Sequence, residues 1–108
     1  MDTTTRYKLL KTLEENPALS QRELARELGM SLGKTNYCVR ALMEKGWVKV
    51  DNFRRSQRKI RYVYNLTPSG VSARARITRS FLRRKIREYE QLEREIRELR
   101  QEVSKGDP

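Results

Sequence analysis

The sequence predicts a mainly α-helical fold with one small β-hairpin and a long C-terminal helix. Apolar residues recur at helical spacing through the first 45 residues, where proline and glycine punctuate the pattern. A run rich in β-branched and aromatic residues follows at 47–66. From Val71 to Val103 the chain contains neither proline nor glycine, which predicts one uninterrupted helix. These observations divide the chain into a compact domain and an extended helix.

Two helices are predicted before residue 30. The first carries an apolar stripe at 9–13 and ends at Asn16-Pro17, because proline disfavours a helical conformation in the residue before it. The second begins with Ser20-Gln21-Arg22-Glu23, a capping box in which serine and glutamate each accept a backbone N–H of the other. Gly29 ends this helix, since glycine tolerates the left-handed backbone of a sharp turn.

A third helix is predicted at 31–45, with Ser31 as its N-cap and Gly46 at its end. Its inward face carries Thr35, Cys38, Val39 and Leu42. Thr35 is expected to donate its hydroxyl to the Ser31 carbonyl, and Cys38 to act as a small buried apolar residue. Apolar packing does not explain the polar outward face, which comprises Ser31, Leu32, Gly33, Lys34, Asn36, Tyr37 and Arg40.

A hairpin is predicted after Gly46, with strands at 47–50 and 60–66 and a long polar tip at 51–59. Tyr62 and Tyr64 stand at alternate positions and so point to one face of the hairpin. This face is more typical of a core face than of a platform on which bases of single-stranded nucleic acid stack. The hairpin completes a predicted first domain, 1–66.

The long helix, 67–103, is predicted to start at Thr67-Pro68, a good N-cap followed by proline at the first helical position. At about 1.5 Å per residue it forms a rod of roughly 50 Å, longer than one small domain can cover. Residues 104–108 are predicted to be a disordered tail. Apolar residues on the rod follow a heptad pattern interrupted at Lys85, and we expect them to meet a second copy of the chain: Leu82, Tyr89, Leu92, Ile96, Leu99 and Val103.

The positive charge is concentrated in the middle of the chain. Residues 51–87 contain twelve basic residues and one acidic residue, a net charge of +11 that equals the formal net charge of the whole chain. This excess predicts a polyanionic partner, with nucleic acid ahead of an anionic membrane surface. The hairpin cluster of Arg54, Arg55, Arg58 and Lys59 favours contact with phosphates or a minor groove. The basic run 74–87 is compatible with flanking DNA, with solubility alone or with an acidic surface.

Composition excludes several classes of site. A single cysteine and no histidine leave no internal disulfide and none of the usual zinc sites, so neither a metal nor a cofactor is expected. No apolar run approaches the roughly 20 residues of a membrane span, and no signal peptide is evident. No nucleophile with its base, phosphate-binding loop or carboxylate pair indicates an enzyme. We expect a protein of the reducing cytoplasm, associated with the nucleoid through DNA.

The segment 21–40 resembles a helix-turn-helix, with small Ala25 at the helix crossing and Gly29 in the turn. With the hairpin added, the order of elements resembles a winged helix-turn-helix followed by a dimerisation helix. The resemblance implies that 31–45 is the recognition helix in the major groove and that 52–59 is the wing. The implied DNA-binding residues are Ser31, Gly33, Lys34, Asn36, Tyr37 and Arg40 from the helix, and Arg54, Arg55, Arg58 and Lys59 from the wing.

More closely, LGMSLGKTNYCVRALMEKGWV followed by YNLTPSG is similar to the MarR-type regulators, over about residues 9–70. RYVYNLTPSG and the long last helix look most like the branch associated with exopolysaccharide gene clusters. The resemblance implies a bacterial, homodimeric regulator of transcription that binds double-stranded DNA. The few residues before the first helix argue against the effector pocket of typical members, and so against a small-molecule effector.

Two questions stay open in the sequence. The alternative function is a winged-helix interaction module that binds an acidic protein partner and has only weak affinity for DNA. The direction of the paired helices is also open. A parallel pair would set Glu95 near Arg100 favourably but Glu88 near Glu93 unfavourably, and an antiparallel pair could gather acidic side chains.

Overall fold

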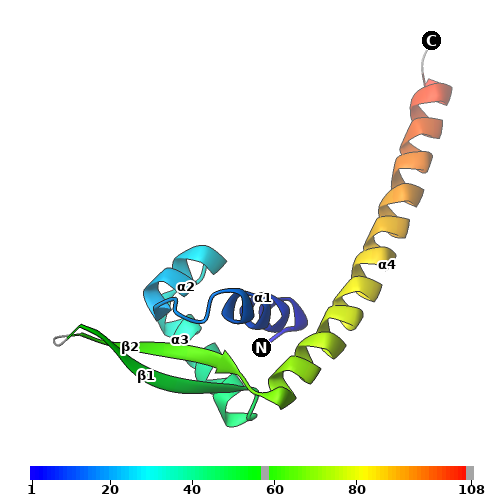
Figure 1. Ribbon diagram of the computed structural model, residues 1–108. Helices are drawn as coiled ribbons and strands as arrows, with labels where there is room; N and C mark the ends of the chain where they lie inside the picture. Colours follow the sequence, from blue (N-terminus) through cyan, green and yellow to red (C-terminus); the bar gives the residue numbers. More distant parts are fainter. Residues whose placement is uncertain (57–58, 107–108) are drawn as a thin grey trace.

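The computed structural model describes residues 1–56 and 59–106, without the side chains of residues 52–61. The elements in order are α1 (Thr3–Glu15), α2 (Gln21–Leu28), α3 (Leu32–Glu44), β1 (Val48–Ser56), β2 (Lys59–Leu66) and α4 (Pro68–Gly106). The three short helices and the antiparallel hairpin form one unit, which we call the head, and α4 leaves it as a rod (Figure 1). The predicted fold class is confirmed.

Leucines from all three short helices build the core of the head. Leu9, Leu10 and Leu13 of α1 have no exposed surface, and neither do Leu24 of α2 and Leu42 of α3. The hairpin adds one buried residue from each strand at the edge of this cluster. Because the apolar stripes of α2 and α3 both face this core, the opposite side of α3 is turned outward.

Side chains cap the start of each short helix. The Asp2 carboxylate accepts the Thr5 backbone N–H at 2.7 Å, and Thr5 lowers the pKa of this carboxyl below its ordinary value. That cap therefore stabilises α1 above the unfolded-state pKa and is lost as the pH falls through the folded-state pKa. The capping box of Ser20 and Glu23 is present as predicted, and Ser31 accepts a backbone N–H at 3.1 Å.

The hairpin is paired over a longer stretch than predicted. Its register runs from Val48 opposite Leu66 to Ser56 opposite Lys59, so the expected long tip at 51–59 was wrong. Backbone hydrogen bonds pair the two strands along this stretch, and an antiparallel pair can form without a core to face. Residues 57–58 lie outside the described residues.

Only one of the two hairpin tyrosines lies in the core. Tyr64 is 7% exposed, and its backbone N–H donates to the Pro17 carbonyl at 3.0 Å. Tyr62 is 56% exposed, so the prediction that both rings form a core face was wrong for Tyr62. Alternation places both rings on the same side of β2, but the three short helices lie beside only the part of the strand nearest α4 (Figure 1).

Thr67 joins the hairpin to α4 and ties both to the end of α3. Its backbone N–H donates to the Trp47 carbonyl at 3.0 Å, and its hydroxyl donates to the Gly46 carbonyl at 2.5 Å. The same hydroxyl accepts the Gly70 N–H at 3.0 Å, which confirms Thr67 as the predicted cap. A Cβ on Gly70 would lie 2.0 Å from the Trp47 carbonyl oxygen. The helix therefore starts against backbone, where only glycine fits.

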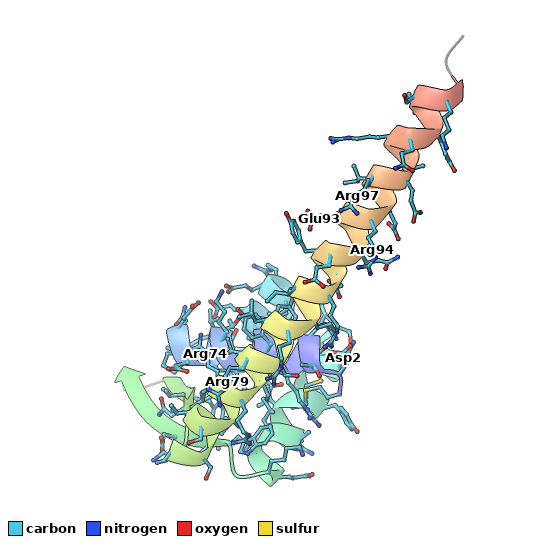
Figure 2. All side chains as sticks on the ribbon, turned by 90° about the vertical axis from the view of Figure 1, so that its right-hand side faces the viewer. Asp2, Arg74, Arg79, Glu93, Arg94 and Arg97 are labelled. Atoms are coloured by element: carbon cyan, nitrogen blue, oxygen red, sulfur yellow. The ribbon has the colours of Figure 1, made fainter. Side chains whose placement is uncertain are left out.

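The first half of α4 is held against α1. Tyr7 and Phe81 stack with ring centroids 4.4 Å apart, and Arg74 forms an ion pair with Glu14 at 2.8 Å. Arg84 donates to the Thr4 hydroxyl near the other end of the contact. The second half continues without cover, so the protein extends over 75 × 27 × 20 Å (Figure 2). The rod is therefore fixed at its base and free beyond it.

The end of α4 differs from the predicted tail at 104–108. The helix continues to Gly106, so the prediction of disorder was wrong for 104–106. No residue in 104–105 breaks a helix, and Lys105 in the last turn favours the negative end of the helix dipole. Residues 107–108 lie outside the described residues.

Candidate nucleic-acid interface

A tight turn sets the angle between α2 and α3. Gly29 adopts a left-handed conformation with φ of 66°, which a residue with a side chain rarely adopts. The Met30 N–H donates back to the Ala25 carbonyl at 2.9 Å and closes the end of α2. Three residues, 29–31, thus separate α2 from α3, as expected of a helix-turn-helix.

The outer face of α3 is open to solvent. Tyr37 is 70% exposed, and a Cβ added to Gly33 would meet no atom within 4 Å. The predicted contact residues of this helix are exposed with one exception: Ser31, Gly33, Lys34, Tyr37 and Arg40. Two cations and two hydroxyl groups thus project from one face of a helix that is capped at its N-terminal end.

Asn36 is the exception, because it is half-buried and already engaged. Its side-chain amide donates to the Gln21 side-chain oxygen at 3.0 Å, and the Gln21 amide donates to the Tyr64 hydroxyl at 3.1 Å. This chain of hydrogen bonds links α3, α2 and β2. The sequence did not predict the hydrogen bonds of Gln21 to Asn36 and Tyr64. Their partners are separated by 15 and 43 positions in the chain, so no local spacing pattern indicates them.

We expect Asn36→Ala to lower the free energy of unfolding by about 1 kcal/mol, because it leaves the Gln21 oxygen without its donor. Urea denaturation of Asn36→Ala, Gln21→Ala and the double variant measures the coupling. A shared bond makes the two single losses non-additive by about 0.5 kcal/mol or more. Additive losses would instead show that the Asn36 to Gln21 bond does not hold α3 in place.

The inward residues of α3 lie as predicted. Thr35 is fully buried, and its hydroxyl donates to the Ser31 carbonyl at 2.8 Å. Cys38 is 2% exposed and packs in the core cluster of the head. Thr35 therefore has the predicted structural role, and its hydroxyl does not face outward.

The predicted wing residues are only partly described. The backbones of Arg54, Arg55 and Lys59 lie in the paired strands β1 and β2, but their side chains are outside the description. Arg58 lies outside the described residues. The ribbon that carries this cluster projects away from α4 (Figure 1). Contact of these residues with DNA stays a prediction.

The predicted seam of α4 is exposed along its whole length. Its members are between 40% and 64% exposed: Leu82, Tyr89, Leu92, Ile96, Leu99 and Val103. Ile86, which is 46% exposed, belongs with them and was missed, because it stands one residue beyond the heptad position of Lys85. The Lys85 ammonium pairs with Glu88 at 3.1 Å. With Val71, eight large apolar side chains of α4 are exposed, and an apolar surface of this extent is typical of an interaction site.

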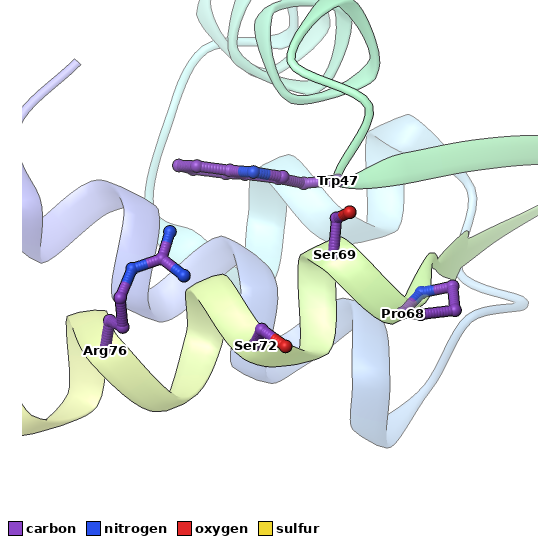
Figure 3. A pocket seen from close by; sticks show the side chains of 5 residues that line it. All are labelled: Trp47, Pro68, Ser69, Ser72 and Arg76. Atoms are coloured by element: carbon purple, nitrogen blue, oxygen red, sulfur yellow. The ribbon is translucent and has the colours of Figure 1, made fainter.

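A depression of about 450 Å³ lies where α3, β1 and α4 meet (Figure 3). The Trp47 ring lines one side, and four residues of α4 line the other: Pro68, Ser69, Ser72 and Arg76. The Lys45 ammonium lies 5.1 Å from the centre of the Trp47 ring. No sequence pattern indicated this site, since its walls come from segments that are distant in the chain. It adds positive charge beside the end of α3.

Within residues 1–56 and 59–106, no three histidine, cysteine or acidic side chains gather as a metal ion would require. Among the helices of this described part, none is long and apolar enough to cross a membrane.

The N-terminal part of the chain is similar to a known family. Residues 2–49 match the family described as winged helix-turn-helix DNA-binding. A candidate transcriptional regulatory protein for the hcr operon of Thauera aromatica is 35% identical over 77 residues, which are 71% of this chain. The alignment spans 45% of that protein, so the chain covers less than half of its relative.

Solved structures share the fold over nearly the whole chain. The Staphylococcus aureus MepR–DNA complex superposes with a TM-score of 0.70 at 20% identity, covering 97% of this chain and 76% of MepR. A MarR family protein of Mycobacterium tuberculosis, in complex with p-aminosalicylic acid, gives 0.64 at 21% identity over 92% and 76%. A MarR/EmrR family regulator from Acinetobacter sp. ADP1 gives 0.63 at 21% over 94% and 75%. The chain therefore shares a winged helix-turn-helix fold with these structures over more than nine-tenths of its length.

Proposed function

We propose that this protein is a sequence-specific regulator of transcription that binds double-stranded DNA as a homodimer. In this proposal α3 enters the major groove, and the wing lies on the backbone or in the minor groove. One observation carries the proposal: Lys34, Tyr37 and Arg40 project from the exposed face of a helix whose other face is locked into the core. The similar fold of MepR, solved as a DNA complex, supports it.

The proposed roles follow from side-chain chemistry. Arg40 can pair bidentately with a guanine edge, whereas Ser31, Lys34 and Tyr37 suit phosphate oxygens. Gly33 leaves room for the backbone of α3 to approach DNA. Asn36 suits an adenine edge, but it would first have to release Gln21, to which it is bonded at 3.0 Å. We therefore place Arg40 ahead of Asn36 as the base-reading residue.

We also propose a branch of the family and a cellular location for the protein. RYVYNLTPSG and the long last helix favour the MarR-like branch associated with exopolysaccharide gene clusters. A regulator of this kind acts on the nucleoid in the cytoplasm, and it needs neither a cofactor nor an enzymatic centre. The chemistry of its partner is that of a polyanion, which matches the formal net charge of +11.

Selection from random duplexes tests this function. The purified protein is incubated with a random-sequence pool at about physiological salt, because phosphate contacts make the affinity strongly salt-dependent. Enrichment of a motif with two inverted half-sites would support a dimeric regulator. If no motif is enriched, the basic surface is non-specific for DNA, and the alternative of an interaction module for an acidic protein replaces the proposal.

Substitution of Arg40 and substitution of the wing arginines should change DNA affinity in different ways. We expect Arg40→Ala to cost about 1–3 kcal/mol on the selected motif and little on random DNA, because it removes a base contact. We expect Arg54→Ala with Arg55→Ala to weaken both DNAs equally and to reduce the salt dependence by about two phosphate contacts. Fluorescence anisotropy over a salt series measures both. Equal losses on both DNAs for Arg40→Ala would contradict this division of roles.

A further inference from the structure

The exposed stripe of α4 begins closer to the head than the predicted seam. Val71 is 49% exposed, and Ala75 and Thr78 are also exposed. Their steps of four, three and four residues lead directly into Leu82, so the heptad pattern runs from 71 to 103. The stripe is uneven. The part of the stripe nearest the head includes the small side chains of Ala75 and Thr78, whereas the free half of α4 carries large apolar side chains.

The charges of α4 are uneven in the same direction. Residues 68–87 contain seven basic and no acidic side chains, whereas residues 88–106 contain six glutamates and four basic side chains. Two copies packed in parallel would bring the two basic halves together. Two copies packed in opposite directions would bring each basic half against an acidic half, which is the favourable arrangement.

From these two asymmetries we infer that a second copy of this chain packs antiparallel along α4, about a twofold axis near residue 87. The inference rests on the homodimer of the proposed function and fixes its geometry. In this register the two smallest residues of the stripe, Ala75 and Thr78, each meet a large one. The core layers are Val71 with the partner's Val103, Ala75 with the partner's Leu99, Thr78 with the partner's Ile96, Leu82 with the partner's Leu92, and Lys85 with the partner's Tyr89.

The surface relief of α4 fits this register. One groove is lined by Val71, Ala75, Thr78 and Arg79 of α4 together with α1 and Arg74, and another is lined by Glu93, Ile96, Arg97 and Arg100. Antiparallel packing in this register places these two segments against each other, with Ile96 of one copy opposite Thr78 of the other.

The positions beside the stripe decide between the two directions. Antiparallel packing sets Arg79 beside the partner's Glu93 and Ile86 beside its own symmetry mate. Neither Arg79 nor Glu93 forms an ion pair within the described chain, and Figure 2 labels one near the head and the other on the free half of α4. Parallel packing would instead set Arg79 beside the partner's Arg74, Glu93 beside the partner's Glu88, and Lys85 beside its own copy. All three contacts bring like charges together, against one favourable contact of Glu95 with the partner's Arg100. The antiparallel pair has one like-charge contact, between the two copies of Glu88.

This geometry puts the two heads at opposite ends of the rod. The two copies of Gly70 are separated by the rise of 34 residues, about 50 Å at 1.5 Å per residue.

Charge exchange at residues 79 and 93 tests the direction. We expect Arg79→Glu and Glu93→Arg each to weaken the dimer at least fivefold in sedimentation equilibrium at low salt, and the double variant to restore it to within about twofold. Arg87→Glu and Glu98→Arg are matched controls, since they make the same charge changes on the side of α4 away from the stripe. All four sites are exposed, so folding should be retained.

Parallel packing gives the opposite result, because each single change then removes a repulsion and tightens the dimer. That outcome would overturn the inference, and so would a wild-type protein that sediments as a monomer. Selection from random duplexes separates this failure from failure of the proposed function. If a DNA motif is enriched but the single variants dimerise more tightly, the proposed function is supported and the antiparallel geometry is rejected. If the double variant restores dimerisation but no motif is enriched, the antiparallel dimer is supported and the proposed function is rejected.

Discussion

Gly70→Ala is expected to destabilise the protein by about 3 kcal/mol or more, the largest single loss at any of its glycines. The added methyl group would lie 2.0 Å from the Trp47 carbonyl oxygen and 2.9 Å from its carbonyl carbon. Neither atom belongs to a side chain that can rotate away. Relief would require α4 to move from Gly46 and Trp47, which would break the hydrogen bonds that Thr67 makes to both.

Gly33→Ala is the matched control, since it makes the same change in another helix. A Cβ there meets nothing within 4 Å, so alanine should stabilise α3 by about 0.5–1 kcal/mol through its better helix propensity. Urea denaturation of both variants measures the contrast. Equal stabilities for the two variants would mean that the junction between β2 and α4 is looser than the contact at Trp47 requires.

Ile96→Lys is expected to abolish dimerisation and to lower the affinity for a DNA site with two half-sites about 100-fold or more, because the second head is no longer linked to the first. Ile96 is 40% exposed, the lowest value among the exposed seam residues. Burying a charge there without a partner costs several kcal/mol per dimer. The head should stay folded, since Ile96 lies outside its core cluster.

Gln101→Lys makes the same charge change on the side of the rod away from the seam, so it should leave both dimerisation and DNA affinity nearly unchanged. Light scattering gives the mass of each variant, and fluorescence anisotropy on single and double half-sites gives the affinities. If Ile96→Lys stays dimeric, the seam is not the interface. If it becomes monomeric without loss on the double half-site, only one head binds DNA.

Local chemistry made most of the helices predictable. Ser20 and Ser31 each accept a backbone N–H three residues ahead, and Gly29 adopts the left-handed conformation that ends α2. These bonds join residues only a few positions apart, so the sequence contains both partners within one short window. The same holds for Thr67 and Pro68 at the start of α4 and for the heptad spacing along it.

The candidate interface was predictable to a lesser extent. Helical periodicity alone places Lys34, Tyr37 and Arg40 on the outward face of α3, where all three are exposed. Asn36 follows the same periodicity but is tied to Gln21, because the angle between α2 and α3 happens to bring their amides within 3.0 Å. The position of Arg76 beside Trp47 depends likewise on how α4 crosses the end of α3.

The sequence by itself thus determined the order of helices and strands, the caps, the exposed seam and the basic middle, because each depends on neighbours in the chain. The tertiary structure decided what depends on distant segments in contact. It set the bond between Asn36 and Gln21, the burial of Tyr64 but not Tyr62, and the need for glycine at 70. The periodicity of the sequence predicts the direction in which a side chain points, but only the packing of the elements determines which groups it contacts.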